Sequence, residues 1–122
     1  MDRFLIILTT IPHYRALHYV SDPIYQFIII ASTTLSITWH YLGEPNSIIK
    51  HLDYFMAAAW SVYEIYLGYN SINFTLIIIL NYIVLLTNNL ISGDYGIKHS
   101  LWHLMSFVKC VFVAYILAKY NK

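Results

Sequence analysis

The sequence predicts an all-α membrane protein, a bundle of helices that crosses the bilayer several times. Of its 122 residues, 59% are hydrophobic and only 11% are charged, whereas a soluble domain carries about 25% charged residues. Two long stretches, 23–43 and 65–93, contain no formally charged residue. A membrane-spanning helix needs about 20 mostly apolar residues. We therefore expect residues 1–122 to form a single polytopic transmembrane domain.

The first 20 residues allow two interpretations. Residues 4–11 are apolar, but a proline, two histidines and an arginine follow within positions 12–18. This pattern suits either a helix that lies at the membrane interface or a fifth spanning helix, and the sequence favours neither. His13, within this stretch, has no partner that the sequence identifies.

Four longer segments are the predicted transmembrane helices. The first begins after Ser21-Asp22-Pro23, where polar cap residues precede a proline at the first helical position. Turns rich in Gly, Pro, Asn and Ser separate the segments. At about 1.5 Å per residue, each segment can cross about 30 Å of hydrocarbon. The predicted spans are 24–42, 52–69, 72–91 and 98–119.

The alternation of these spans gathers ionisable residues at one side of the membrane, which we call the histidine end. His40 closes the first span, Asp53 opens the second, and His99 opens the fourth. Ser36 and His103 each lie one helical turn from one of these histidines and on the same helix face. Polar residues inside a bilayer are costly and usually face a bundle interior or a cavity. We therefore expect one polar layer at the histidine end.

The spacing of His99 and His103 is that of a metal chelate. Because the two residues are four positions apart on a helix, both rings project from one face. His40 completes a three-imidazole set, which with an open fourth position is the ligand set of a catalytic zinc. Such an ion lowers the pKa of water to about 7, so that Asp53 could accept a proton and Ser36 could donate a hydrogen bond to the developing oxyanion. The alternative interpretation is a structural polar layer that joins the helices by hydrogen bonds.

These residues fall in three ordered motifs. Residues 36–40, Ser-Ile-Thr-Trp-His, form a Ser-x3-His element, Asp53 follows in the next span, and residues 99–103, His-Ser-Leu-Trp-His, close the set. In this order the motifs resemble the CREST superfamily of membrane hydrolases and receptors, which includes the alkaline ceramidases, the progestin and adipoQ receptors and the GPI-anchor lipid-remodelling proteins. The resemblance implies a zinc ion held by His40, His99 and His103 near one membrane face.

The chain is shorter than members of that superfamily, which are typically seven-helix proteins. They have three helices between the aspartate helix and the His-x3-His helix, where this sequence has only the span 72–91. Losing two adjacent helices keeps both motif ends on one side, but it removes part of the wall of the lipid cavity. A homo-oligomer, or residues 1–20, would supply the missing wall.

The function that the resemblance implies is zinc-dependent hydrolysis of a lipid amide or ester at the membrane interface. The partners would be the bilayer and a membrane lipid, whereas a net charge of +1 without a basic cluster does not favour nucleic acid. Two other classes stay open. One is a non-catalytic receptor-like or scaffold protein with a structural zinc, and the other is a haem protein with two axial histidines. Haem gives no role to Asp53 or to a third histidine.

Two charged residues lie deep within the predicted spans. Glu64 follows Asp53 by eleven residues and Lys109 follows His99 by ten, so both lie about 15 Å deeper from the same side. We predict that Glu64 and Lys109 form an intramembrane ion pair with a structural role.

The distribution of Lys and Arg weakly indicates the orientation. With four spans, two basic residues lie at the histidine end and four at the opposite end, which by the positive-inside rule puts the site on the lumenal or external face. If residues 1–20 also span, Arg3 moves to the histidine end and the two counts become equal.

Overall fold

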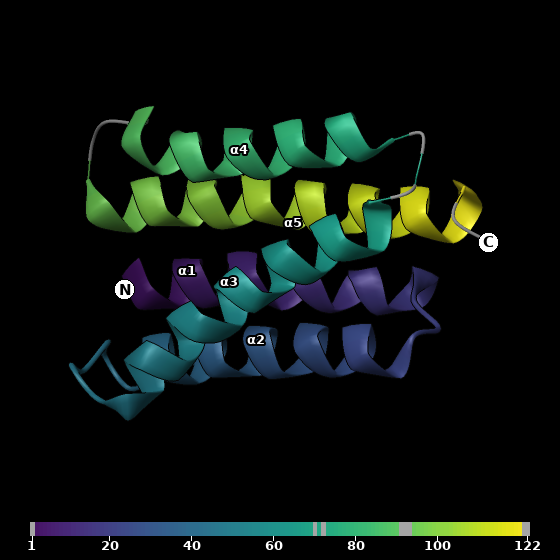
Figure 1. Cartoon of the computed structure of the whole chain (residues 1–122). Coiled ribbons are helices and arrows are strands. Elements are labelled where there is room, and N and C mark those ends of the chain that lie inside the picture. The colour runs from purple at the N-terminus through teal and green to yellow at the C-terminus, as the bar shows by residue number, and fades with distance from the viewer. Residues whose placement is uncertain (1, 70, 72, 91–93, 121–122) are drawn as a thin grey trace.

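The computed structural model describes residues 2–69, 71, 73–90 and 94–120, and all regular structure in these ranges is helical. Successive elements alternate in direction along the bundle, with the first two acting as one arm (Figure 1). The elements are α1 (Asp2–Thr10), the 3₁₀ helix η1 (Ile11–Tyr19), α2 (Pro23–Tyr41), α3 (Ile48–Gly68), α4 (Phe74–Leu90) and α5 (Tyr95–Tyr120). The all-α prediction is confirmed.

The four predicted segments correspond to α2, α3, α4 and α5, with differences at their ends. Helix α3 begins at Ile48, four residues before the predicted start, and α5 begins at Tyr95, three residues early. Residues 72 and 91, the predicted ends of the third segment, lie outside the described residues. The predicted cap of α2 is confirmed, since Oδ1 of Asp22 accepts hydrogen bonds from the backbone N–H groups of Ile24 and Tyr25 at 2.8 and 3.3 Å.

Residues 2–19 form an arm that runs alongside the other helices. Both α1 and η1 pack against α2 and α5, and Figure 1 shows them passing between these two helices along the bundle. The side chains of Ile6 and Ala16 are completely buried. Helix type changes next to Pro12, which has no N–H to continue an α-helix. Because a 3₁₀ helix rises about 2.0 Å per residue, the nine residues of each element together extend about 30 Å.

The arm changes the balance of basic residues. The Nη1 atom of Arg3 donates to the carbonyl of Tyr41, at 3.3 Å, so Arg3 lies at the histidine end with Lys50 and Lys98. The sequence analysis showed that the numbers of Lys and Arg at the two ends become equal when Arg3 lies at the histidine end. The excess of basic residues at the opposite end therefore disappears. The positive-inside rule then gives no preference for a lumenal or external site.

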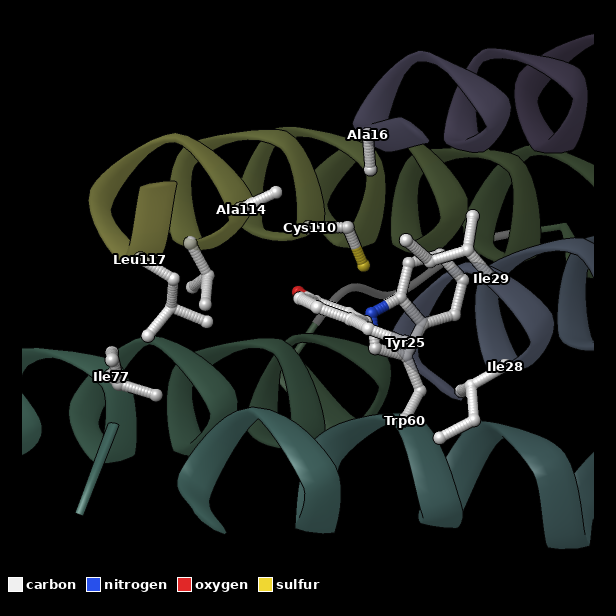
Figure 2. Packing of buried hydrophobic residues seen from close by; sticks show 10 residues of the cluster. Ala16, Tyr25, Ile28, Ile29, Trp60, Ile77, Cys110, Ala114 and Leu117 are labelled. Carbon is white, nitrogen blue, oxygen red and sulfur yellow. The ribbon is translucent and has the colours of Figure 1, made fainter. Parts of the chain in front are cut away.

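An apolar cluster fills the half of the bundle away from the histidine end. It joins five of the six elements, and Gly68 helps α3 approach α4, because a Cβ at this position would lie 2.5 Å from Cδ1 of Ile77. Figure 2 shows the packing of Ala16, Tyr25, Ile28, Ile29, Trp60, Ile77, Cys110, Ala114 and Leu117. These contacts fix how the helices approach one another next to the polar layer.

The predicted ion pair between Glu64 and Lys109 is confirmed. Nζ of Lys109 lies 2.8 Å from Oε1 of Glu64, whose side chain is completely buried. The other carboxylate oxygen, Oε2, accepts hydrogen bonds from the hydroxyl of Tyr25 at 2.9 Å and from Nε1 of Trp60 at 3.1 Å. The pair therefore ties α2, α3 and α5 together at mid-bundle.

Among the described helices, one is long and apolar enough by itself to cross a membrane. It is the stretch Tyr95–Lys119 of α5, and the apolar part of α4, Phe74–Thr87, is shorter. Helices α2 and α3 contain more polar residues, several of which are buried inside the bundle, including Ser32, Thr33 and Glu64. The hydropathy of single helices therefore does not confirm the predicted four-span arrangement.

Candidate metal centre

Three histidine rings meet where α2 ends and α5 begins. The ligand nitrogens of His40, His99 and His103 all lie within 4.8 Å of one another. The closest measured pair is Nε2 of His40 and Nε2 of His103, at 3.3 Å. The ring of His99 lies 5.0 Å from that of His40 and 4.7 Å from that of His103, between centroids. The predicted gathering of these three histidines into a group that can hold a metal ion is confirmed.

Local packing fixes the two histidines of α5. The indole of Trp102, between them in sequence, stacks on the ring of His99 at 5.5 Å with an interplanar angle of 26°. Its Nε1 donates to the carbonyl of Val84 at 2.9 Å, which anchors this turn of α5 to α4. A tryptophan N–H needs such a partner when it is buried. Trp102 thus sets the rotation of the helix that presents both rings.

The separation of the nitrogens fits a tetrahedral metal site. Zinc binds imidazole nitrogen at about 2.0–2.1 Å, so two ligands of a tetrahedral ion lie about 3.3 Å apart. His40 and His103 have this separation. Both are buried, at 1% and 5% exposure, whereas His99 is half-buried and leaves one side of the group accessible. An all-imidazole set suits zinc, copper, iron or nickel, and the geometry alone does not identify the ion.

One fully buried ring nitrogen of the group has no hydrogen-bond partner among the described residues. Nδ1 of His40 is buried and unpartnered among the described residues, and Oε2 of Glu44 lies 3.5 Å away from it. Metal-bound histidines commonly direct the second ring nitrogen at a carboxylate. The sequence analysis missed Glu44, because the predicted span ends at residue 42, and a residue beyond the end of a helix is not expected to contact position 40.

A cavity of about 410 Å³ lies beside the histidines and extends to Lys109. The side chains of Ser36 and Asp53 line it, and both residues are 7% exposed. Neither forms a hydrogen bond or an ion pair with another residue in the described ranges. Asp53 is not one of the clustered ligand groups. The structure thus places both predicted catalytic residues on the cavity wall, while their catalytic roles stay predictions.

A fourth histidine also borders this cavity. His13 is 5% exposed, and its ring centroid lies 5.9 Å from that of His103 and 6.0 Å from that of Trp60. Nδ1 of His13 donates to the carbonyl of Thr10 at 2.8 Å, which leaves Nε2 as the unprotonated nitrogen of a neutral ring. The sequence identified no partner for His13, and the structure gives it contacts with Thr10, Trp60 and His103. Only the knowledge that residues 2–19 form an arm between α2 and α5 would have revealed this residue.

No protein-family model matches the chain, and neither a curated protein nor a solved structure shows significant similarity to it. The resemblance to the CREST superfamily therefore depends on the three motifs themselves. The functional argument depends on the geometry of the histidine group and of the cavity beside it.

Proposed function

We propose that the chain is a zinc-dependent hydrolase of the CREST type, embedded in a membrane and acting on a lipid amide or ester. The observation that carries this proposal is the 3.3 Å separation of Nε2 atoms in a three-histidine group next to a polar cavity. Three imidazoles with an open fourth position are typical of catalytic zinc, whereas structural zinc sites have four protein ligands.

The distribution of polar and apolar side chains supports a bundle with several spans. Charged and polar groups lie inside it, including Glu64, Lys109 and His103. Large apolar side chains are exposed on every helix, as at Phe27 and Phe55, which are 65% and 67% exposed. Polar residues within membranes face the bundle interior, so the hydropathy of α2 and α3 is lowered by residues that do not meet lipid. Because α1 and η1 run in one direction as a single arm, the arm and the helices α2 to α5 would cross the bilayer five times.

Each residue of the site then has a defined task. His40, His99 and His103 would hold the zinc ion. When bound, zinc supplies a Lewis acid that makes water nucleophilic near neutral pH. Asp53 accepts the proton of the attacking water at its carboxylate, and Oγ of Ser36 donates a hydrogen bond to the oxygen of the carbonyl under attack. The cavity holds the reacting group, because about 410 Å³ lies within the range of small-molecule sites, about 300–1,000 Å³.

A second function has one observation in its favour. The Nε2 atoms of His40 and His103, 3.3 Å apart, can form a hydrogen bond with each other. These two rings can therefore pair with each other without an ion. In that case the protein is a non-catalytic scaffold or receptor-like protein whose helices are joined by histidines.

The experiment that tests the proposal measures the metal content of the chain purified in detergent. We expect about one zinc ion per chain and no Soret band, and we expect His99→Ala to lose most of the zinc because it removes one of three ligands. His18→Ala is the matched control, since His18 is an exposed histidine outside the group. Turnover of amide-linked and ester-linked lipids, abolished in His103→Ala, would establish hydrolysis.

Two other outcomes would contradict the proposal. Stoichiometric zinc without turnover of any lipid supports the non-catalytic alternative. Unchanged zinc content in His40→Ala shows that the three-ligand assignment is wrong.

A further inference from the structure

The turn after α2 has an unusual backbone at Glu44. Glycine 43 has φ +87° and Glu44 has φ +60°, so two consecutive residues are left-handed. The N–H groups of these residues bond to the carbonyls of His40 and Trp39, at 3.1 and 2.9 Å, which closes the helix in a Schellman motif. Glycine occupies left-handed positions without strain, but a glutamate there carries a conformational cost.

The side chain of Glu44 is held between two helices. The hydroxyl of Tyr95, at the start of α5, donates to Oε1 of Glu44. The other oxygen, Oε2, lies 3.5 Å from Nδ1 of His40. The next residue is also fixed, since Nε1 of Trp39 donates to the carbonyl of Pro45 at 2.9 Å. The carboxylate is therefore aimed at the buried nitrogen of His40 that has no hydrogen bond of its own.

The backbone of the turn does not need this carboxylate. The helix is already closed by main-chain bonds, and neither carboxylate oxygen accepts from the backbone of the described residues. The two atoms it does approach are a tyrosine hydroxyl and a ring nitrogen of the metal group. The contacts of its side chain with Tyr95 and His40 therefore explain why a glutamate occupies this left-handed position.

We propose that Glu44 is a positioning residue of the metal centre, an inference that rests on the proposed metal function. It accepts the Nδ1–H of His40, so that this ring keeps Nε2 directed at the ion and the carboxylate raises the basicity of the ligand. Tyr95 in turn holds Glu44 and thereby couples the orientation of the α2 ligand to the helix that carries the other two ligands.

The test measures zinc affinity on the full chain in detergent by competition with a chelator. Loss of such a carboxylate lowers metal affinity by about 10- to 100-fold, and we expect this loss in Glu44→Gln and in Glu44→Asn, because asparagine also suits a left-handed backbone. Tyr95→Phe should weaken binding only a few-fold, since the carboxylate remains. Asp94→Asn is the control, as it removes an exposed negative charge at the same end of the bundle.

A second readout separates positioning from a structural role. In zinc-loaded protein labelled with ¹⁵N in histidine, the Nδ1–H signal of His40 should be strongly downfield, and Glu44→Gln should shift it. Thermal unfolding of the metal-free variants should match the wild type. If the wild type binds zinc and both variants bind it within twofold, with the Nδ1–H signal unchanged, the inference is wrong while the metal centre stands. If the wild type binds no zinc, both are overturned.

Discussion

The bundle has two buried polar centres that differ in how completely their atoms are paired. At mid-bundle, both oxygens of Glu64 are occupied, one by Lys109 and the other by Tyr25 and Trp60. At the histidine end, Nδ1 of His40 has no hydrogen bond, and Asp53 makes none with any described residue. The atoms of the first centre pair with one another, and we call it the closed centre, although Lys109 borders the same cavity. The second centre presents to that cavity atoms of His40 and Asp53 that are unpaired among the described residues.

This difference separates structural from functional polar groups. A buried charge is costly unless hydrogen bonds and an opposite charge compensate for it, and Glu64 has both. A buried group left without partners costs stability, so it persists where something else completes it. This difference supports the proposal that a ligand binds in the cavity, whose wall also carries the other buried atoms without partners in the described ranges, Oγ1 of Thr33 and Oδ1 of Asn81. The first two of the following predictions test that comparison.

The largest expected effect is the loss of turnover in Asp53→Asn. Under the proposed mechanism, Asp53 accepts the proton of the attacking water, so removing its carboxylate should lower kcat by about 10²- to 10⁴-fold. Zinc content and thermal stability should stay at the wild-type level, because Asp53 is neither a clustered ligand nor part of a hydrogen bond among the described residues. Rate measurements with a lipid substrate and metal analysis check this. Loss of zinc from Asp53→Asn would show instead that Asp53 positions one of the histidine ligands.

The closed centre should show the opposite pattern. Glu64→Gln leaves Lys109 without its countercharge and should destabilise the fold by about 3–5 kcal/mol, while zinc affinity changes little. The double variant Glu64→Gln with Lys109→Met should recover much of this loss, because no unpaired charge remains. Unfolding in mixed detergents measures both effects. Purely additive losses in the double variant would show that the two residues do not interact.

The smallest expected effect concerns a polar contact at the other end of the bundle. The hydroxyl of Tyr63 donates to Oδ2 of Asp22 at 2.8 Å, and this hydrogen bond lowers the pKa of the Asp22 carboxyl from its usual value. A depressed pKa in the folded state stabilises the protein above the unfolded pKa, about 4, and this contribution is lost as the pH falls through the folded value. Tyr63→Phe should therefore cost about 0.5 kcal/mol at pH 7, since solvent competes for this partly buried contact.

The pH profile of thermal unfolding checks this prediction. The difference between wild type and Tyr63→Phe should narrow below pH 4. Tyr66→Phe is the matched control, because Tyr66 is a neighbouring tyrosine that is 69% exposed. A difference that is constant from pH 7 to pH 3 would mean that the contact does not involve the charged carboxylate.

The helices, the group of three histidines and the ion pair could all be predicted from the amino-acid sequence. Each of these depends on spacing within a helix or on the alternation of helix directions. Residues four apart share a face, and helices of similar length that alternate return the chain to the same end, so His40 could be expected beside His99 and His103. Glu64 and Lys109 were paired by counting their depth along two parallel helices.

The positions of His13 and Glu44 could not be predicted from the sequence. The N-terminal stretch has no apolar length that defines a span, and residues 2–19 pack into the bundle because α2 and α5 offer them a surface to pack on. Glu44 reaches His40 because two left-handed residues reverse the chain. A glycine after a helix, such as Gly43, signals the first of them, but nothing in the sequence predicts that a glutamate is the second. Helical periodicity is a local property of the backbone. The positions of His13 and Glu44 instead depend on packing between segments that are far apart in the sequence.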